Sequence, residues 1–64
     1  MFEDYIVQAL EEDRVITIKM ISENNIISVR QFVEESDDVL VVVDTFKDVQ
    51  MIVKRNISTV RIDY

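Results

Sequence analysis

The sequence predicts a mainly β domain: one short amino-terminal α-helix, then a strongly bent five-stranded antiparallel sheet that forms a small barrel. Three observations support this class. Val and Ile supply 20 of the 64 residues, and β-branched side chains suit the pleated surface of a sheet. The hydrophobic period changes from helical to alternating after about the first dozen residues. Polar, turn-like clusters then separate the apolar runs, and the length fits a single domain, 1–64.

The first segment, about residues 2–12, has the spacing of an amphipathic helix. Its apolar side chains fall at the i, i+3, i+4, i+7 and i+8 positions of one face; they are Phe2, Tyr5, Ile6, Ala9 and Leu10. Glu3 and Asp4 suit the positive end of the helix dipole. About three turns are marginal in isolation, so we expect this helix to dock on the sheet.

Five strands are expected next, over about residues 15–21, 26–34, 39–44, 49–54 and 57–62. The continuous apolar run 39–43 predicts a strand that is covered on both sides and central to the core. Residues 49–53 also carry apolar side chains on both faces, so this strand too is expected to be covered. Because the chain contains no Gly or Pro, we expect Asn56 to supply a positive φ at the last turn.

The small size of the chain favours self-assembly. It has no cysteine and no histidine, so neither disulfides nor the usual zinc site can stabilise it. Oligomerisation is therefore the expected source of additional stability. The fourth and fifth strands carry little edge charge and no proline. Pairing them head-to-tail between copies would give either a filament or a closed ring, and the small size and unprotected edges favour a ring of about five to seven subunits. The candidate subunit-interface residues are Val49, Met51, Ile52, Val53, Ile57, Val60 and Ile62.

Composition excludes several functions. A net charge of −6 argues against general attraction to DNA or an anionic membrane. No apolar run approaches the roughly 20 residues that span a bilayer, and the acidic start is unlike a secretory signal, so a soluble, cytoplasmic protein is expected. No nucleophile–base constellation indicates an enzyme, and no cofactor is implied. The acidic run 34–38 lacks the spacing of a metal loop, and no metal site is predicted.

One basic corner is the exception to the acidic composition. Lys54 and Arg55 are the only adjacent basic residues, and they lie with Asn56 at the turn between the last two strands. A ring would gather these cations about its axis. The alternative, which the residues alone leave open, is that both side chains solvate a turn or pair with acids such as Asp48 or Asp63.

The order of elements and three segments resemble the Sm-like family, and within it the bacterial Hfq branch. The segments are Gln8-Ala9-Leu10, Val39-Leu40-Val41-Val42 and the run 53–60. The last is the most specific, since Hfq typically has Tyr-Lys-His-Ala-Ile-Ser-Thr-Val there, and five of its eight residues recur in register. The resemblance covers about residues 8–60. It implies bent barrels, rings of about five to eight subunits and, in many members, RNA binding around the pore.

The resemblance also implies a pore site that contains Lys54, Arg55, Asn56 and Gln8. Lys54 matches the lysine that Hfq uses at its uridine-binding pore, and Arg55 replaces the neighbouring histidine while keeping a hydrogen-bond donor. Asp38, however, stands where Hfq has the Phe on which a base stacks.

Other positions depart from the Hfq pattern as well. Lys19 lies near the place of a purine-stacking Tyr, and Glu11 and Glu12 replace rim arginines. Arg30 lies near the place of the family's second-strand glycine.

These matches to the Hfq pattern and departures from it leave two possible functions. We expect an Sm-like ring that binds single-stranded, U-rich RNA at the pore, in RNA metabolism or riboregulation. The alternative is an Sm-fold oligomeric scaffold for protein interactions that has lost RNA binding. The retained Lys54 and the family favour the first function, whereas the acidity and the missing aromatic side chains favour the second.

Overall fold

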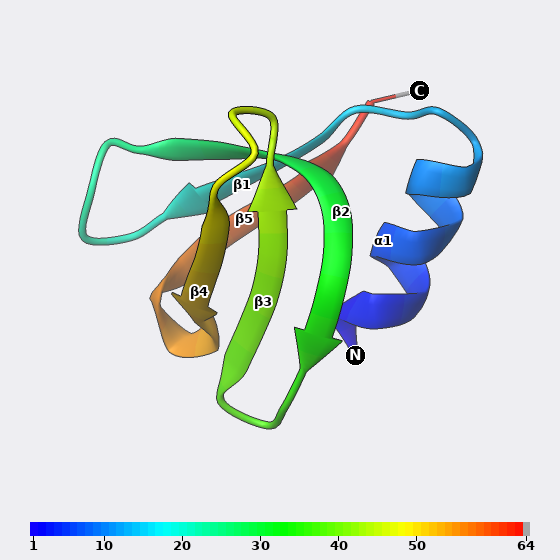
Figure 1. Ribbon diagram of the computed structural model, residues 1–64. Helices are drawn as coiled ribbons and strands as arrows, with labels where there is room; N and C mark the ends of the chain where they lie inside the picture. The colour runs from blue at the N-terminus through cyan, green and yellow to red at the C-terminus, as the bar shows by residue number, and fades with distance from the viewer. Residues whose placement is uncertain (64) are drawn as a thin grey trace.

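Across residues 1–63, which the computed structural model describes, one helix precedes five antiparallel strands in one sheet (Figure 1). The predicted mainly β fold class is confirmed. The elements are α1 (Phe2–Glu11), β1 (Ile16–Met20), β2 (Ile26–Glu35), β3 (Val39–Asp44), β4 (Val49–Val53), the 3-10 turn η1 (Lys54–Asn56) and β5 (Ile57–Ile62). The strand order is β4-β3-β2-β1-β5. Each predicted helix or strand lies within one residue of these bounds.

Hydrogen bonds do not close the sheet into a barrel, which corrects the predicted closure. β4 pairs only with β3, and β5 pairs only with β1, so these strands are the two edges of the described sheet. Val53 and Ile57, on either side of η1, are extended, with φ/ψ of −73/118° and −82/123°. The turn therefore carries the chain from the front layer to the back layer in Figure 1 instead of folding it into a hairpin.

β2 makes the bend of the sheet without a glycine. Its first part, up to Val29, pairs with β1, and its second part, from Val29 onward, pairs with β3. Irregularities in the second pairing fall between Val29 and Gln31 and between Phe32 and Glu34. Each inserts one extra residue, and such bulges bend a strand and increase its twist. Arg30 is thus the bulged residue of the first irregularity, and by the sequence resemblance it lies near the place of the Sm-like glycine.

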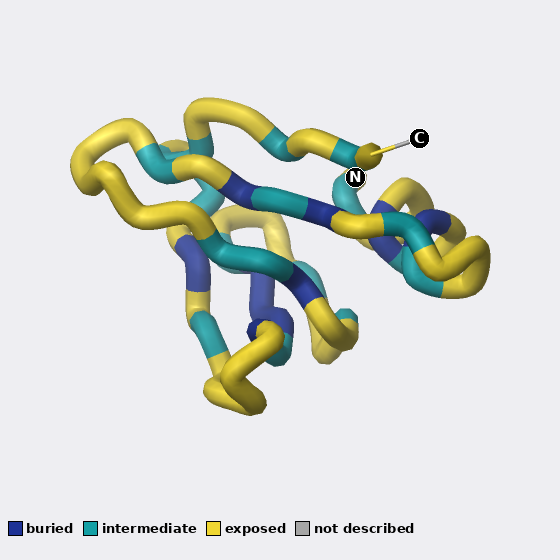
Figure 2. The backbone as a smooth tube through the Cα atoms, turned by 90° about the horizontal axis from the view of Figure 1, so that it is seen from above, coloured by how far each residue is buried: buried dark blue, intermediate teal, exposed yellow. Residues whose placement is uncertain are grey.

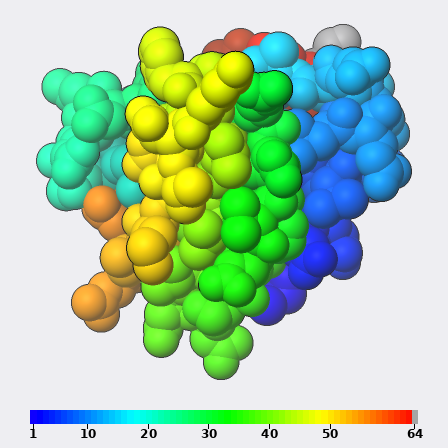
Figure 3. Space-filling model, viewed as in Figure 1, coloured from blue at the N-terminus to red at the C-terminus, as the bar shows by residue number. Residues whose placement is uncertain are grey.

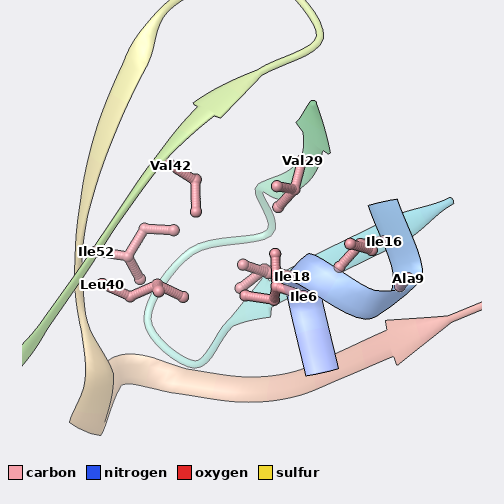
Figure 4. Close-up of a cluster of buried hydrophobic side chains, with 8 residues drawn as sticks. All are labelled: Ile6, Ala9, Ile16, Ile18, Val29, Leu40, Val42 and Ile52. Atoms are coloured by element: carbon pink, nitrogen blue, oxygen red, sulfur yellow. The ribbon is translucent and has the colours of Figure 1, made fainter. Parts of the chain in front are cut away.

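The core lies between α1 and the inner face of the bent sheet. Its buried side chains come from α1 and from β1 to β4, and converge as Figure 4 shows: Ile6, Ala9, Ile16, Ile18, Val29, Leu40, Val42 and Ile52. In β3, Val41 is also buried although it faces the other way. The prediction of a central third strand covered on both sides is therefore confirmed. In Figure 2 the turns are mostly exposed, and the buried residues lie within the strands and the helix.

β4 is covered on one face only, so the prediction that both its faces are covered is wrong for the single chain. Ile52 is 2% exposed, whereas Val49, Met51 and Val53 are 64%, 75% and 44% exposed. Their side chains alternate along an edge strand, and β4 forms part of the front surface in Figure 3. The edge therefore carries a row of apolar side chains that nothing in the described chain covers.

Two turns show how the chain manages without glycine. The positive φ predicted at Asn56 is not found, because Asn56 belongs to the 3-10 turn η1. Among the described residues, positive φ occurs at Asp13 (57°) and Lys47 (71°). In the β3–β4 turn the buried Asp44 carboxylate accepts hydrogen bonds from the backbone N–H groups of Phe46 and Asp48 and from Gln50 Nε2, each at 2.9 Å. Side-chain hydrogen bonds thus stabilise a turn that often uses glycine.

Candidate functional site

The basic corner η1 is fixed to two neighbouring segments. The Lys54 backbone N–H donates to the Asp38 carbonyl oxygen at 2.9 Å, and the Asn56 carbonyl oxygen accepts from the Ile21 N–H at 2.7 Å. Asn56 Oδ1 also accepts from the Ser22 N–H at 3.2 Å. The corner is thus tied to the β2–β3 turn and to the end of β1, so its side chains project from a well-held backbone.

The Lys54 side chain forms an ion pair with Glu35 at the end of β2. The Lys54 side chain is 15% exposed and that of Glu35 is 1% exposed. The Lys54 Nζ also lies 5.8 Å from the centroid of the Phe2 ring, within cation–π range. Lys54 therefore has an acidic partner within the chain, which is Glu35 and not Asp48 or Asp63.

Glu35 also caps the first turn of α1. The Phe2 N–H donates to Glu35 Oε2 at 3.1 Å, and the Glu3 N–H donates to Oε1 at 2.8 Å. The N-cap residue, Met1, makes no side-chain capping bond, so a carboxylate from β2 satisfies donors that a helix start otherwise leaves unpaired. One buried group thereby joins α1, β2 and η1.

These contacts also set the charge of Glu35. Burial raises the pKa of its carboxyl, but the hydrogen bond from Lys54 and those from the Phe2 and Glu3 N–H groups, with the Lys54 charge, hold it below the ordinary 4.5. Glu35 is therefore an anion at neutral pH, and Lys54 faces its negative charge.

Arg55 projects from the same turn and is exposed. It has no ion-pair or hydrogen-bond partner among residues 1–63. A cavity of about 610 Å³ beside it is lined by Phe2, Asp37, Asp38, Val39, Val53, Lys54 and Arg55. With Glu35 included, the corner carries three acids and two bases, so Arg55 is the cation that it presents to solvent.

Gln8 lies apart from this corner. It is six residues beyond Phe2 on α1, which is about 9 Å along a helix. Its Nε2 donates to Glu12 Oε2 at 3.3 Å, and it lines a separate cavity of about 140 Å³ with Tyr5, Ala9, Glu12, Arg14 and Ile62. The structure therefore brings Lys54, Arg55 and Asn56 together within one chain and leaves Gln8 elsewhere.

The predicted interface residues fall into three groups. Val49, Met51 and Val53 are exposed on the β4 edge. Ile57, Val60 and Ile62 on β5 are half-buried against the core. Ile52 is buried in the core of its own chain, so only its backbone groups are available for pairing with another copy.

Glu35 is the site residue that sequence reasoning missed. It belongs to an acidic run that reads as a solvated turn. Strict alternation along β2 would place Phe32 and Glu35 on opposite faces, but the bulges bring Val29, Phe32 and Glu35 to the inner face at a spacing of three. The missing N-cap at Met1 was the available signal, because it implies that another group must satisfy the helix start.

Residues 1–63 contain neither a cluster of metal-ligating side chains nor a membrane-spanning helix. No group of three or more His, Cys, Asp or Glu residues is arranged there to hold a metal ion. No helix there has the length and apolar character needed to cross a membrane.

A comparison with protein-family models, curated proteins and solved structures finds no match for the chain. An amino-terminal helix followed by five antiparallel strands in the order β4-β3-β2-β1-β5 is consistent with Sm-like topology.

Proposed function

We propose that the chain assembles into an Sm-like ring and binds single-stranded, U-rich RNA at the corners formed by Lys54, Arg55 and Asn56. The proposal rests on the position of η1, which joins the two unpaired edge strands. If β4 of one copy pairs with β5 of the next, every junction carries one corner, and a closed ring places all corners at the same height about its axis.

The exposed row on β4 supports the assembly step. Val49, Met51 and Val53 leave apolar surface in water beside unpaired backbone groups, and such an edge is a template for another strand. Pairing with β5 of a second copy would satisfy both edges and bury apolar surface that a 64-residue domain needs for stability.

The two cations support RNA binding in different ways. Arg55 is exposed and unpartnered among the described residues, so it is available to a phosphate. The Lys54 ammonium carries three N–H donors. Glu35 accepts from one side of the ammonium, and the remaining N–H donors are available to a base carbonyl or a phosphate. Because the Glu35 pair already restrains Lys54, ordering it on binding costs little side-chain entropy.

An oligomeric scaffold for protein partners is the second candidate, and the acidic surroundings of the corner favour it. Asp37 and Asp38 line the same cavity as Arg55, and the chain carries a net charge of −6. A ring of this kind would repel a polyanion and present acidic faces to basic partners.

Fluorescence polarisation of a labelled oligouridine at low salt separates the two candidates. We expect binding that weakens as salt rises, and a lower affinity with a shallower salt slope for Arg55→Ala. The matched control is Lys47→Asn, which removes a positive charge from another turn and keeps a residue that tolerates the φ of 71°. If the unmodified protein assembles but gives no polarisation change, the scaffold function replaces RNA binding.

A further inference from the structure

A second cavity lies beside the corner, between the first turn of α1 and β5. Its volume is about 470 Å³. Phe2 and Tyr5 line it from the helix, and Val60 and Ile62 line it from the strand, while Glu35 and Lys54 lie at its polar end. We propose that this cavity receives one nucleobase of the bound single strand, stacked on Tyr5 and Phe2 and hydrogen-bonded to Lys54. This inference rests on the RNA-binding function proposed above.

The two aromatic side chains form the apolar wall of the site. They are three residues apart on α1 and so lie next to each other on one helical face. The Tyr5 side chain is 66% exposed, whereas Phe2 packs against the core and is held in place. An exposed aromatic face beside a fixed one is the arrangement on which bases of single strands stack.

The polar end of the cavity offers a donor and not an acceptor. The Glu35 oxygens already accept from the Phe2 N–H, the Glu3 N–H and Lys54. The Lys54 Nζ, 5.8 Å from the Phe2 ring centroid, retains N–H donors directed away from Glu35. A pyrimidine with carbonyl oxygens, such as uracil, presents the matching acceptors.

The neighbouring cavity offers a contact for the phosphate backbone of the RNA strand. Phe2 and Lys54 line both cavities, so the two are adjacent, and Arg55 lines the second. A base in the first cavity therefore leaves its phosphate within the reach of a long, exposed guanidinium. A guanidinium next to the apolar cavity favours a nucleotide strand over the main competing occupant, an apolar side chain such as Met51 from a second copy.

An indole reporter tests the stack directly, because the chain contains no tryptophan. In the Tyr5→Trp variant, oligouridine is expected to quench the indole fluorescence along the same curve as the polarisation signal. The control is Phe46→Trp, at an 84% exposed aromatic position in the β3–β4 turn, which should show no such quenching. Unchanged indole fluorescence in Tyr5→Trp at saturating oligouridine would overturn the stacking proposal and leave RNA binding itself intact.

Affinity and mass measurements complete the test. Loss of one stacked base predicts that Tyr5→Ala binds oligouridine about 5- to 150-fold more weakly, while Tyr5→Phe, which keeps the ring, retains the affinity. Tyr5 is exposed, so neither change should unfold the chain. If Tyr5→Ala instead lowers the mass measured by light scattering, a second copy fills the cavity and the proposal is wrong. If the unmodified protein gives no polarisation change, the RNA function fails, and the base site fails with it.

Discussion

The buried Glu35 carboxylate pairs with Lys54 while it accepts two hydrogen bonds from the first turn of α1. Glu35 and the Phe2 backbone are 33 positions apart in the chain. The start of the helix, the end of β2 and the basic corner therefore share one anion. Changes at this anion should affect both the stability of the fold and the position of the Lys54 ammonium.

The first prediction concerns the removal of that charge. Glu35→Gln should lower the free energy of unfolding by about 1–3 kcal/mol, because buried donors lose a charged acceptor. Glu34→Gln removes the same charge from the adjacent exposed position and should change the free energy by about 0.5 kcal/mol or less. Urea unfolding followed by circular dichroism compares the two variants, and equal effects would contradict a special role for Glu35.

The second prediction concerns acid. The pKa of Glu35 in the folded state lies below its ordinary 4.5: burial opposes the shift, and the Lys54 and backbone hydrogen bonds outweigh it. A carboxyl with a depressed folded pKa stabilises the fold above its unfolded pKa, and this stabilisation is lost as the pH falls through the folded value. The free energy of unfolding should therefore decrease as the pH falls below about 4.5.

Asp44 adds to the same acid dependence. The hydrogen bond from Gln50 and that from the Asp48 N–H lower its pKa below the ordinary 3.8 against the effect of burial, and the Phe46 N–H adds to the lowering. Urea titrations at several pH values measure the combined effect. Glu35→Gln should flatten the curve in part, and a curve as steep as that of the unmodified protein would show that Glu35 does not titrate as described.

The third prediction concerns the β4 edge. Met51→Lys should reduce a ring to smaller species, because a lysine on an edge strand opposes pairing with another chain. Met51 is 75% exposed in the single chain, so the fold itself should survive. Val33→Lys is the control, since Val33 is 47% exposed but belongs to β2, an interior strand. Light scattering on a sizing column measures the masses; an unmodified protein that is monomeric at micromolar concentration would refute the assembly.

The fourth prediction separates two places where glycine might be introduced. Arg30 is the bulged residue at the first of the two β2 bulges, but its φ is not positive, so Arg30→Gly should gain nothing locally and cost about 0.5–1 kcal/mol of backbone entropy. Lys47 has a φ of 71°, and Lys47→Gly should be neutral or stabilising because it relieves a strained conformation. Thermal unfolding of both variants checks the contrast, and a stabilised Arg30→Gly would mean that the bulge does not supply the bend.

The local pattern of the sequence determined the elements. Ile16 and Ile18 alternate with Thr17 and Lys19 and are buried as an alternating strand requires, and the run 39–43 predicted the buried third strand. These properties belong to single segments, because a side chain's face follows from the period of its own backbone. The basic corner was equally visible, since Lys54 to Asn56 are consecutive.

Only the tertiary structure decided how these segments meet. Two bulges in β2 turn Glu35 inward against the simple alternation of a strand, so an acidic residue that reads as solvated became the partner of Lys54 and the cap of α1. The exposure of Met51 and the unclosed edges likewise depend on which strands pair. Pairing register and long-range contacts arise from the packing of the whole chain, and no single segment of the sequence encodes them.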